Sequence, residues 1–301
     1  MSYVELPSDV QGQSYIRCSA LAAGFLWLPD REVFQDSLDL DTNIGSKVPS
    51  LCFLLQHEQH GKLLFDLGLR KHALGYPPAM EDDLKLFAAE CESDICDLLS
   101  QGGTQPTEIR TIIYSHLHFD HTGDLSPFPS AHLILGEHSK QLLASAYPIN
   151  PKSRLNSIPS TQTVSYIEFT DQDSQSLSFG ASVLDFFNDG SLYLLDAPGH
   201  MLGHLNALVR VAPNSFVLLA GDACHNRACY NPGVRLVSTE NHHDIHVARE
   251  TVDRIKRFHA LDNVVVILSH ERERLHEMPM FPLMLNDWAV QETDRKRQRS
   301  K

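Results

Sequence analysis

The stretch His116-Leu-His-Phe-Asp-His121 places three imidazoles and one carboxylate within six positions. It follows the apolar run 109–114, which predicts a buried strand. Because side chains alternate along an extended chain, we expect the first two histidines to point the same way. The aspartate and the last histidine follow where the backbone turns toward Thr122-Gly123, and they are expected to reach a neighbouring position. Such ligands suit zinc, with manganese, iron or cobalt as alternatives.

Three more apolar runs are each followed by a residue type that binds metals. The run 192–195 precedes Ala197-Pro198-Gly199-His200, the run 216–221 precedes Asp222, and the run 264–269 ends just before His270. Each run is typical of a buried strand, so the pattern predicts several strands that deliver ligands at their carboxyl ends. The alternative, in which these histidines are surface or helix-capping residues, does not account for this order.

Taken together, His-x-His-x-Asp-His, Pro-Gly-His, Gly-Asp and a late Ser-His resemble the signature series of the metallo-β-lactamase-fold hydrolases. The resemblance covers about residues 48–275 and includes Leu-Phe-Asp-Leu-Gly at 64–68, which is similar to an early strand–turn element of the family. It implies an α/β fold of the αββα sandwich type, with two mixed β-sheets flanked by helices. We expect a single domain over residues 1–301, ending in a frayed, solvated basic tail at about 294–301.

The resemblance also implies which side chains bind metal. Two zinc ions are expected, with manganese, iron or cobalt as substitutes. The first would be bound by His116, His118 and His200, and the second by Asp120, His121 and His270, with Asp222 bridging both. Asp66 is expected to be a turn or supporting residue rather than a ligand, and His204 to form hydrogen bonds behind the ligands.

Details within the family favour a hydrolase that acts on a lactone. The iron redox branch usually has an acidic residue where His118 stands, and common secreted β-lactamases use a cysteine where this chain has Asp222. The tandem Pro-Gly-His-Met-Leu-Gly-His at 198–204 most resembles quorum-quenching lactonases and their relatives. The implied reaction opens a small lactone, such as an acyl-homoserine lactone, by attack of a metal-bridging hydroxide. Hydrolysis of a small lactam or thioester stays open, as does a non-catalytic metal-bound binding module.

Two residues are predicted to act in catalysis. The resemblance implies that Asp120 holds the nucleophile and later passes on its proton. Lactonase relatives have a tyrosine that touches the substrate carbonyl shortly after the bridging aspartate, and His225 is the nearest position here. This histidine is interpreted as a hydrogen-bond donor or acid, with an exposed loop histidine as the alternative. The cluster at His242, His243 and His246 has no carboxylate in register and is predicted to lie on the surface.

Composition restricts the partners and the compartment. The net charge of −13 argues against nucleic-acid binding, and no apolar run approaches the ~20 residues that span a membrane. The first residues lack a basic segment followed by an apolar one, so a cytoplasmic protein is expected. The six cysteines form no Cys-x-x-Cys pair and are expected to be reduced thiols. The expected partner is a small-molecule substrate, and the oligomeric state stays open between monomer and homodimer.

Periodicity places the remaining elements. Apolar and polar spacing predicts paired strands at 48–56 and 62–67 and helices at 81–100, 138–147 and 246–259. The segment 20–28 is interpreted as a buried strand or loop, in which Phe25, Leu26 and Trp27 line either the core or a substrate cleft. The loop 148–163 is either a lid or substrate wall, or a surface insertion.

Overall fold

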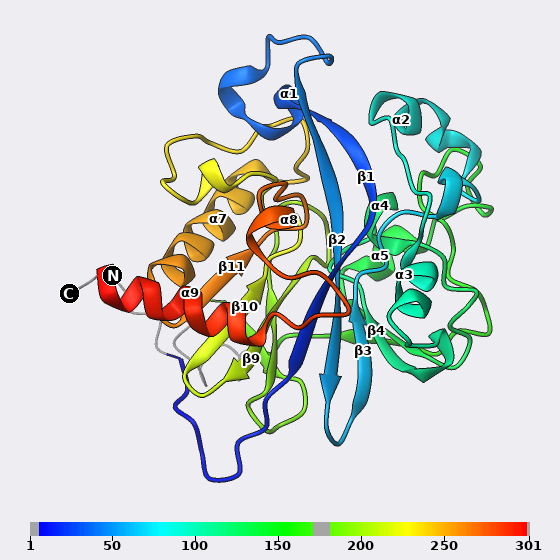
Figure 1. The fold of residues 1–301 in the computed structure, drawn as a ribbon. Coiled ribbons are helices and arrows are strands. Elements are labelled where there is room, and N and C mark those ends of the chain that lie inside the picture. Colours follow the sequence, from blue (N-terminus) through cyan, green and yellow to red (C-terminus); the bar gives the residue numbers. More distant parts are fainter. Residues whose placement is uncertain (1–5, 171–180, 300–301) are drawn as a thin grey trace.

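The computed structural model describes residues 6–170 and 181–299, and its centre is a pair of β-sheets packed face to face (Figure 1). The strand order is β1-β2-β3-β4-β5-β6 in the first sheet and β11-β10-β9-β8-β7 in the second. The first sheet contains β1 (Arg17–Pro29), β2 (Gly45–His57), β3 (Gly61–Phe65), β4 (Ile109–Ile113), β5 (His132–Gly136) and β6 (Val164–Ile167). The second contains β7 (Val183–Asp185), β8 (Leu192–Asp196), β9 (Leu205–Ala212), β10 (Ser215–Leu219) and β11 (Val264–Ile267).

Both sheets mix parallel and antiparallel pairs. In the first sheet β1, β2 and β3 pair antiparallel, whereas β3 to β6 pair parallel. In the second sheet β7 to β10 pair antiparallel, and β10 pairs parallel with β11. Strands β8, β10 and β11 therefore run in the same direction, and their carboxyl ends lie at one edge of the second sheet. The predicted ligands His200, Asp222 and His270 follow these strands, so the strand order brings them together at this edge.

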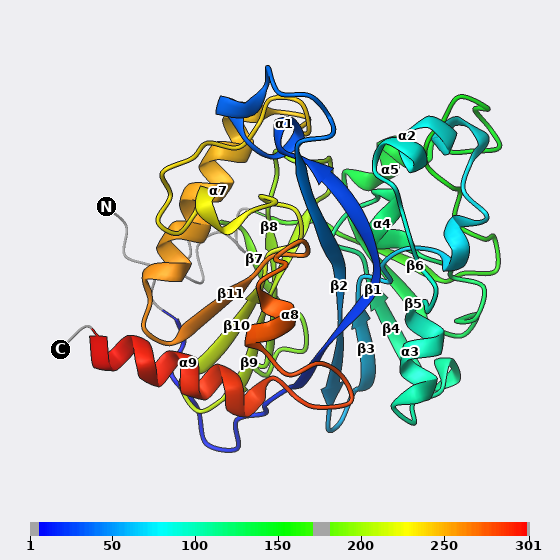
Figure 2. The same cartoon turned by 45° about the horizontal axis from the view of Figure 1, so that its top comes forward.

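Helices cover the outer faces of both sheets (Figure 2). Ile95 and Leu99 of α3 pack against the first sheet, and Val252 and Ile255 of α7 pack against the second. The predicted αββα sandwich is confirmed. The helices are α1 (Asp30–Val33), α2 (Glu81–Leu86), α3 (Ile95–Gln101), α4 (Phe119–Thr122), α5 (Ser139–Leu143), α7 (Ile245–Ala260), α8 (Arg274–Glu277) and α9 (Asn286–Arg299).

The apolar runs in the sequence have a direct structural cause, which β10 illustrates. Val217 and Leu219 point into the core between the sheets, whereas Phe216 and Leu218 point toward α7. Because both faces of the strand are buried, the run is continuously apolar instead of alternating. Burying each such side chain stabilises the fold by about 1.5–3 kcal/mol.

Most predicted elements are confirmed. The strands expected at 48–56 and 62–67 are β2 and β3, and the segment 20–28 lies inside β1. The helix expected at 246–259 is α7, and the one expected at 138–147 is the shorter α5. The segment 148–163 contains no regular helix or strand, as predicted for a loop.

The helix predicted over 81–100 is wrong in its middle. The chain forms α2 and α3 and leaves the helical path between them, with Ala88 at φ 41°. The Phe25 N–H donates to the Glu90 carbonyl and the Glu90 N–H donates back, both at 2.8 Å. Strand β1 lies at the edge of its sheet, so its free backbone groups pair with this segment in place of a further turn of helix.

The expectation of a frayed basic tail is also wrong for the described residues. Helix α9 continues to Arg299, through the basic stretch. The Lys296 ammonium donates to the carbonyls of His259 and Val264, at 2.9 and 2.6 Å. These contacts attach the last turns of α9 to the end of α7 and to β11, so the tail is not frayed, whereas Arg295 and Arg299 are exposed to solvent as expected.

Two smaller expectations concern the thiols and the membrane. All six cysteines are free, and Cys224 and Cys229 are buried in the core against α7. Among residues 6–170 and 181–299, no helix combines the length and the apolar character needed to cross a bilayer.

Candidate metal centre

The predicted ligands converge into two groups at the edge where the ligand-bearing strands end. Asp222 belongs to both groups. Within each group, one ligand atom of every residue lies within 4.8 Å of the others. The groups are His116, His118, His200 and Asp222, and Asp120, His121, Asp222 and His270. All of these residues are buried except His118, which is half-buried.

The first group is formed by three imidazoles that face one point. His116 Nε2 lies 2.8 Å from His118 Nδ1, because two positions along an extended chain bring both rings to one side. His200 Nε2, from the turn after β8, lies 2.9 Å from His118 Nδ1 and 3.2 Å from His116 Nε2. Burial lowers the pKa of His118 to about 4 and the pKa values of His116 and His200 well below 6.5. The three rings are therefore neutral and present lone pairs at a common position.

The second group contains carboxylates between its imidazoles. The short helix α4 turns Asp120 and His121 inward. His270 Nε2 lies 3.3 Å from Asp120 Oδ2 and 3.2 Å from Asp222 Oδ2, and His121 Nε2 lies 3.2 Å from the same Asp222 oxygen. Burial alone would lower the pKa of His270, but Asp222 and Asp120 outweigh it and raise this pKa to about 10. The second group therefore attracts positive charge.

Partners behind the ligands fix which nitrogen of each ring faces the site. His270 Nδ1 donates to the Pro49 carbonyl at 2.8 Å, and His121 Nδ1 lies 2.9 Å from Asp66 Oδ2. Asp66 also accepts from the Ser115 N–H and hydroxyl, both at 2.7 Å. With φ at 63°, Asp66 ends β3 in a turn, so the structure places it behind a ligand, as predicted.

Two further histidines support the ligands. His204 Nε2 accepts a hydrogen bond from the Asp222 N–H at 3.1 Å, as expected of a residue behind the ligands. His242, predicted to lie on the surface, is half-buried, and its Nδ1 lies 3.3 Å from His200 Nδ1. Burial lowers the pKa of His242 to about 3. The prediction failed because a loop returns this residue to the site, and no strand pattern precedes it.

The residues present fit a pair of divalent cations. His121 Nε2 and Asp222 Oδ1 are buried and form no hydrogen bond in the described structure. Buried polar atoms in proteins nearly always have a partner, and metal ions between these groups would supply one. Neutral imidazole nitrogens and carboxylate oxygens are the ligands that zinc accepts.

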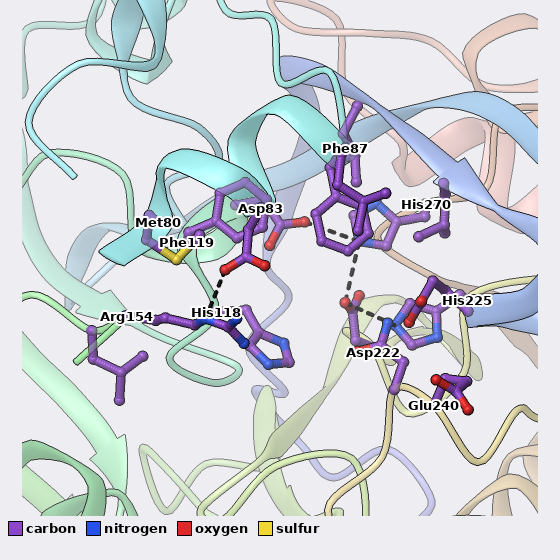
Figure 3. Close-up of a pocket in the computed structure, with 17 residues that line it drawn as sticks. Met80, Asp83, Phe87, His118, Phe119, Arg154, Asp222, His225, Glu240 and His270 are labelled. Atoms are coloured by element: carbon purple, nitrogen blue, oxygen red, sulfur yellow. Dashed lines mark hydrogen bonds and ion pairs between the residues drawn. The ribbon is translucent and has the colours of Figure 1, made fainter. Parts of the chain in front are cut away.

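A cavity of about 290 Å³ opens above the two groups (Figure 3). His118, Asp120, Asp222, His225 and His270 face it from below. Its apolar wall consists of Leu26, Leu28, Met80, Leu86, Phe87, Phe119 and Leu155, and its charged residues above the groups are Glu32, Asp83, Arg154 and Glu240.

The cavity decides two alternatives left by the sequence. Arg154 and Leu155 belong to the loop 148–163, so this loop is a wall of the cavity. Leu26 lines the cavity, whereas its neighbours Phe25 and Trp27 are not among the lining residues. Alternation along β1 explains this, because adjacent side chains point to opposite faces.

His225 lies inside the cavity and is not an exposed loop histidine. Its side chain is 2% exposed. The Nε2 atom lies 3.3 Å from Asp222 Oδ2 and 3.4 Å from the side-chain nitrogen of Asn241. This places an imidazole beside the ligand shared by both groups, where it faces any molecule that enters the cavity.

The fold and the two ligand groups are those of a known class of metal-dependent enzymes. Residues 45–270 match the model of the metallo-beta-lactamase superfamily, and the chain belongs to this superfamily.

Curated relatives differ in length and in the activity they are named for. The chain is 36% identical over 273 residues to the cytochrome P450 monooxygenase mpaDE of Penicillium roqueforti, a match that covers 80% of this chain and 32% of that protein. It thus spans about a third of the first relatives it matches. It is 31% identical to the metallo-hydrolase mfmC of Annulohypoxylon moriforme, covering 83% of this chain and 77% of mfmC. The gamma-lactamase FDB1 of Fusarium pseudograminearum is 27% identical, with 79% and 70% covered.

Solved structures share the fold. A mutant of AiiA from B. thuringiensis, with N-decanoyl-L-homoserine bound at its active site, superposes with a TM-score of 0.70. The match covers 90% of this chain and 99% of that one at 20% identity. This likeness establishes the common architecture.

Proposed function

We propose that the chain is a dinuclear zinc hydrolase that opens a small lactone of the acyl-homoserine type. The observation that supports this most is the convergence of the two ligand groups on the shared Asp222, beneath a cavity that admits a small molecule. Bound zinc ions would supply Lewis acidity toward a water molecule and toward the substrate carbonyl. The first ion would be held by His116, His118 and His200, the second by Asp120, His121 and His270, with Asp222 between them.

Asp120 is the proposed proton carrier. Burial would raise the pKa of this carboxyl group, but His121 and His270 outweigh it and lower the pKa, so Asp120 is ionised at neutral pH. It lies in the cavity floor and is positioned to take the proton of the attacking water. The same proton passes to the ester oxygen as the acyl C–O bond breaks, which balances the addition of water to the lactone.

His225 is proposed to donate a hydrogen bond to the substrate carbonyl oxygen. We infer that it takes the role of the tyrosine in the lactonases that this chain resembles, because it follows Asp222 closely and is buried in the cavity beside it. A donor that faces the developing oxyanion contributes most when water is excluded. The apolar wall formed by Phe87, Phe119 and Leu155 would limit the access of water to a bound substrate.

Hydrolysis of a small lactam is the second candidate. The likeness to the gamma-lactamase FDB1 favours it, because that relative shares most of its length with this chain. The same floor residues would serve, since water would then add to an amide in place of an ester.

A substrate panel combined with metal analysis tests the proposal. We expect about two zinc ions per chain and opening of an acyl-homoserine lactone faster than hydrolysis of a γ-lactam. His118→Ala should abolish turnover, whereas His276→Ala, an exposed histidine on α8, should not alter it. Two bound metals without hydrolysis of any ester or lactam would overturn the proposal in favour of a binding module. Faster cleavage of the lactam would make the second candidate the function.

A further inference from the structure

A second cavity of about 190 Å³ adjoins the first beneath the loop 148–163. The two cavities share Phe119, Arg154 and Leu155 as wall residues. Arg70 lines the second cavity only. We propose that this second cavity is an anion subsite, in which Arg70 binds a carboxylate at the end of the substrate's side chain.

The guanidinium of Arg70 is a cation without a counterion in the described structure. Its Nε is buried and has no hydrogen-bond partner, and no ion pair joins it to a carboxylate within residues 6–170 and 181–299. A buried N–H of a charged group is costly to leave without an acceptor. A carboxylate is the natural partner, because it accepts two parallel hydrogen bonds from an arginine.

The other charged groups of this cavity already have partners. Arg154 Nε lies 2.8 Å from Asp83 Oδ2, an ion pair visible in Figure 3. The Asp124 carboxylate accepts from the N–H and hydroxyl of Ser126, at 3.0 and 2.8 Å. Among the charged residues of this lining, Arg70 therefore has a buried N–H that is still without an acceptor.

Local contacts fix the position of Arg70. The backbone N–H of Arg70 donates to the Tyr76 hydroxyl at 2.7 Å. That hydroxyl in turn donates to the Phe119 carbonyl at 3.2 Å. The guanidinium carbon lies 5.6 Å from the centre of the Tyr76 ring. Tyr76 thus ties the arginine to the backbone between His118 and Asp120.

Phe119 forms the partition between the two cavities. Its ring centre lies 6.0 Å from that of Phe87, on the side of the metal groups, and 5.8 Å from that of Tyr76, on the side of Arg70. A molecule whose ring sits over the metal groups would therefore extend an apolar chain along Phe119 and Leu155 before it reaches the guanidinium. The position of the lactone ring at the metal groups is taken from the function proposed above, on which this part of the inference rests.

The charged residues favour this orientation over the reverse. Glu32 and Glu240 line the first cavity above the metal groups and repel an anionic tail. The second cavity is lined by Arg70 and Arg154 against one carboxylate, Asp124, so an anionic tail is favoured there. The inferred substrate is a lactone whose side chain is apolar near the ring and ends in a carboxylate.

Two matched lactones test the inference kinetically. N-adipoyl-homoserine lactone ends in a carboxylate, and its N-(6-oxoheptanoyl) analogue has a methyl ketone in the same place. We expect the wild type to prefer the first, and Arg70→Gln to raise KM for it about 10- to 100-fold with kcat little changed. KM for the ketone should stay constant, and Arg70→Lys should restore part of the loss. Arg295→Gln, an exposed arginine on α9, is the matched control and should change neither substrate.

A binding measurement separates this inference from the proposed function. The ring-opened forms of both compounds are titrated calorimetrically into the zinc-loaded wild type and Arg70→Gln. Tighter binding of the adipoyl form, lost in Arg70→Gln, supports the subsite even if neither lactone is hydrolysed. Equal affinity of the two forms for the wild type overturns it, whether or not the lactones are opened. A loss in Arg70→Gln that is the same for both compounds also overturns it, because Arg70 would then only position Tyr76.

Discussion

The two ligand groups meet at Asp222 but differ in charge. The first presents neutral imidazoles from His116, His118 and His200 and has no carboxylate other than the shared one. The second adds Asp120 to Asp222 and has the buried Asp66 behind His121. Without metal, the imidazoles of the first group lose their protons easily, whereas those of the second are held protonated by the surrounding carboxylates.

This difference shows that the chain prepares its two positions in different ways. The first position consists of neutral imidazole nitrogens, and Asp222 is its negatively charged residue. The second already stabilises positive charge, as protons when metal is absent. The two cations should therefore differ in affinity and in the number of protons that their binding displaces.

The largest expected effect comes from removing what the positions share. Asp222→Asn deletes the charge common to both groups, so both cations should be lost at micromolar free zinc. Lewis-acid assistance is worth several kcal/mol, so kcat/KM for the lactone should fall by about 10³-fold or more. Elemental analysis and steady-state kinetics check this, with the exposed Asp253→Asn as a control. Retention of two cations would show that Asp222 does not join the groups.

Single-ligand variants should separate the positions. His118→Ala is expected to empty the first position and His270→Ala the second, leaving about one zinc per chain in each case. Affinity at the altered position should fall at least about 100-fold, since even partners behind the ligands contribute 10- to 100-fold. Zinc titration against a chromophoric chelator measures it. Loss of both ions in either variant would mean that the two groups bind as one unit.

The sequence was sufficient to predict that these candidate ligands lie together, because several of them follow apolar strands. Strand ends are local features, and His116, His200, Asp222 and His270 come directly after β4, β8, β10 and β11 or within a few residues of them. The continuous apolar runs indicated sheets buried on both faces, which is what the sandwich requires. The order of the motifs then gave the architecture.

What the sequence could not place depends on how distant loops return to the site. His242 reaches His200 from the loop before α7, and Arg70 reaches the second cavity from the segment after β3. Neither position is marked by periodicity, because tertiary packing alone decides where such loops lie. The failed helix at 81–100 has the same origin, since the edge of β1 pairs with Glu90.

Substitutions behind the ligands should have intermediate effects that follow the same division. Asp66→Asn weakens the support of His121 and should lower zinc affinity at the second position by about 10- to 100-fold. His242→Ala removes the contact with His200 Nδ1 and should lower affinity at the first position alone. Chelator competition in the two variants gives both constants. A similar loss at both positions in either variant would contradict separate support of the two groups.

The smallest effect is a difference in proton release. In the metal-free chain His270 has a pKa of about 10 and is protonated at pH 7, whereas His118 has a pKa of about 4 and is neutral. His121 in the same group is also held protonated, so zinc binding to the second position must displace protons from both imidazoles, whereas binding to the first displaces none. Affinity at the second position should then rise at least about tenfold per pH unit from pH 7 toward 10, because rising pH removes the competing protons. Affinity at the first position should stay flat over that range. Calorimetry of His118→Ala and His270→Ala in buffers of different ionisation enthalpy counts the protons, and equal counts would show that the two positions are electrostatically alike.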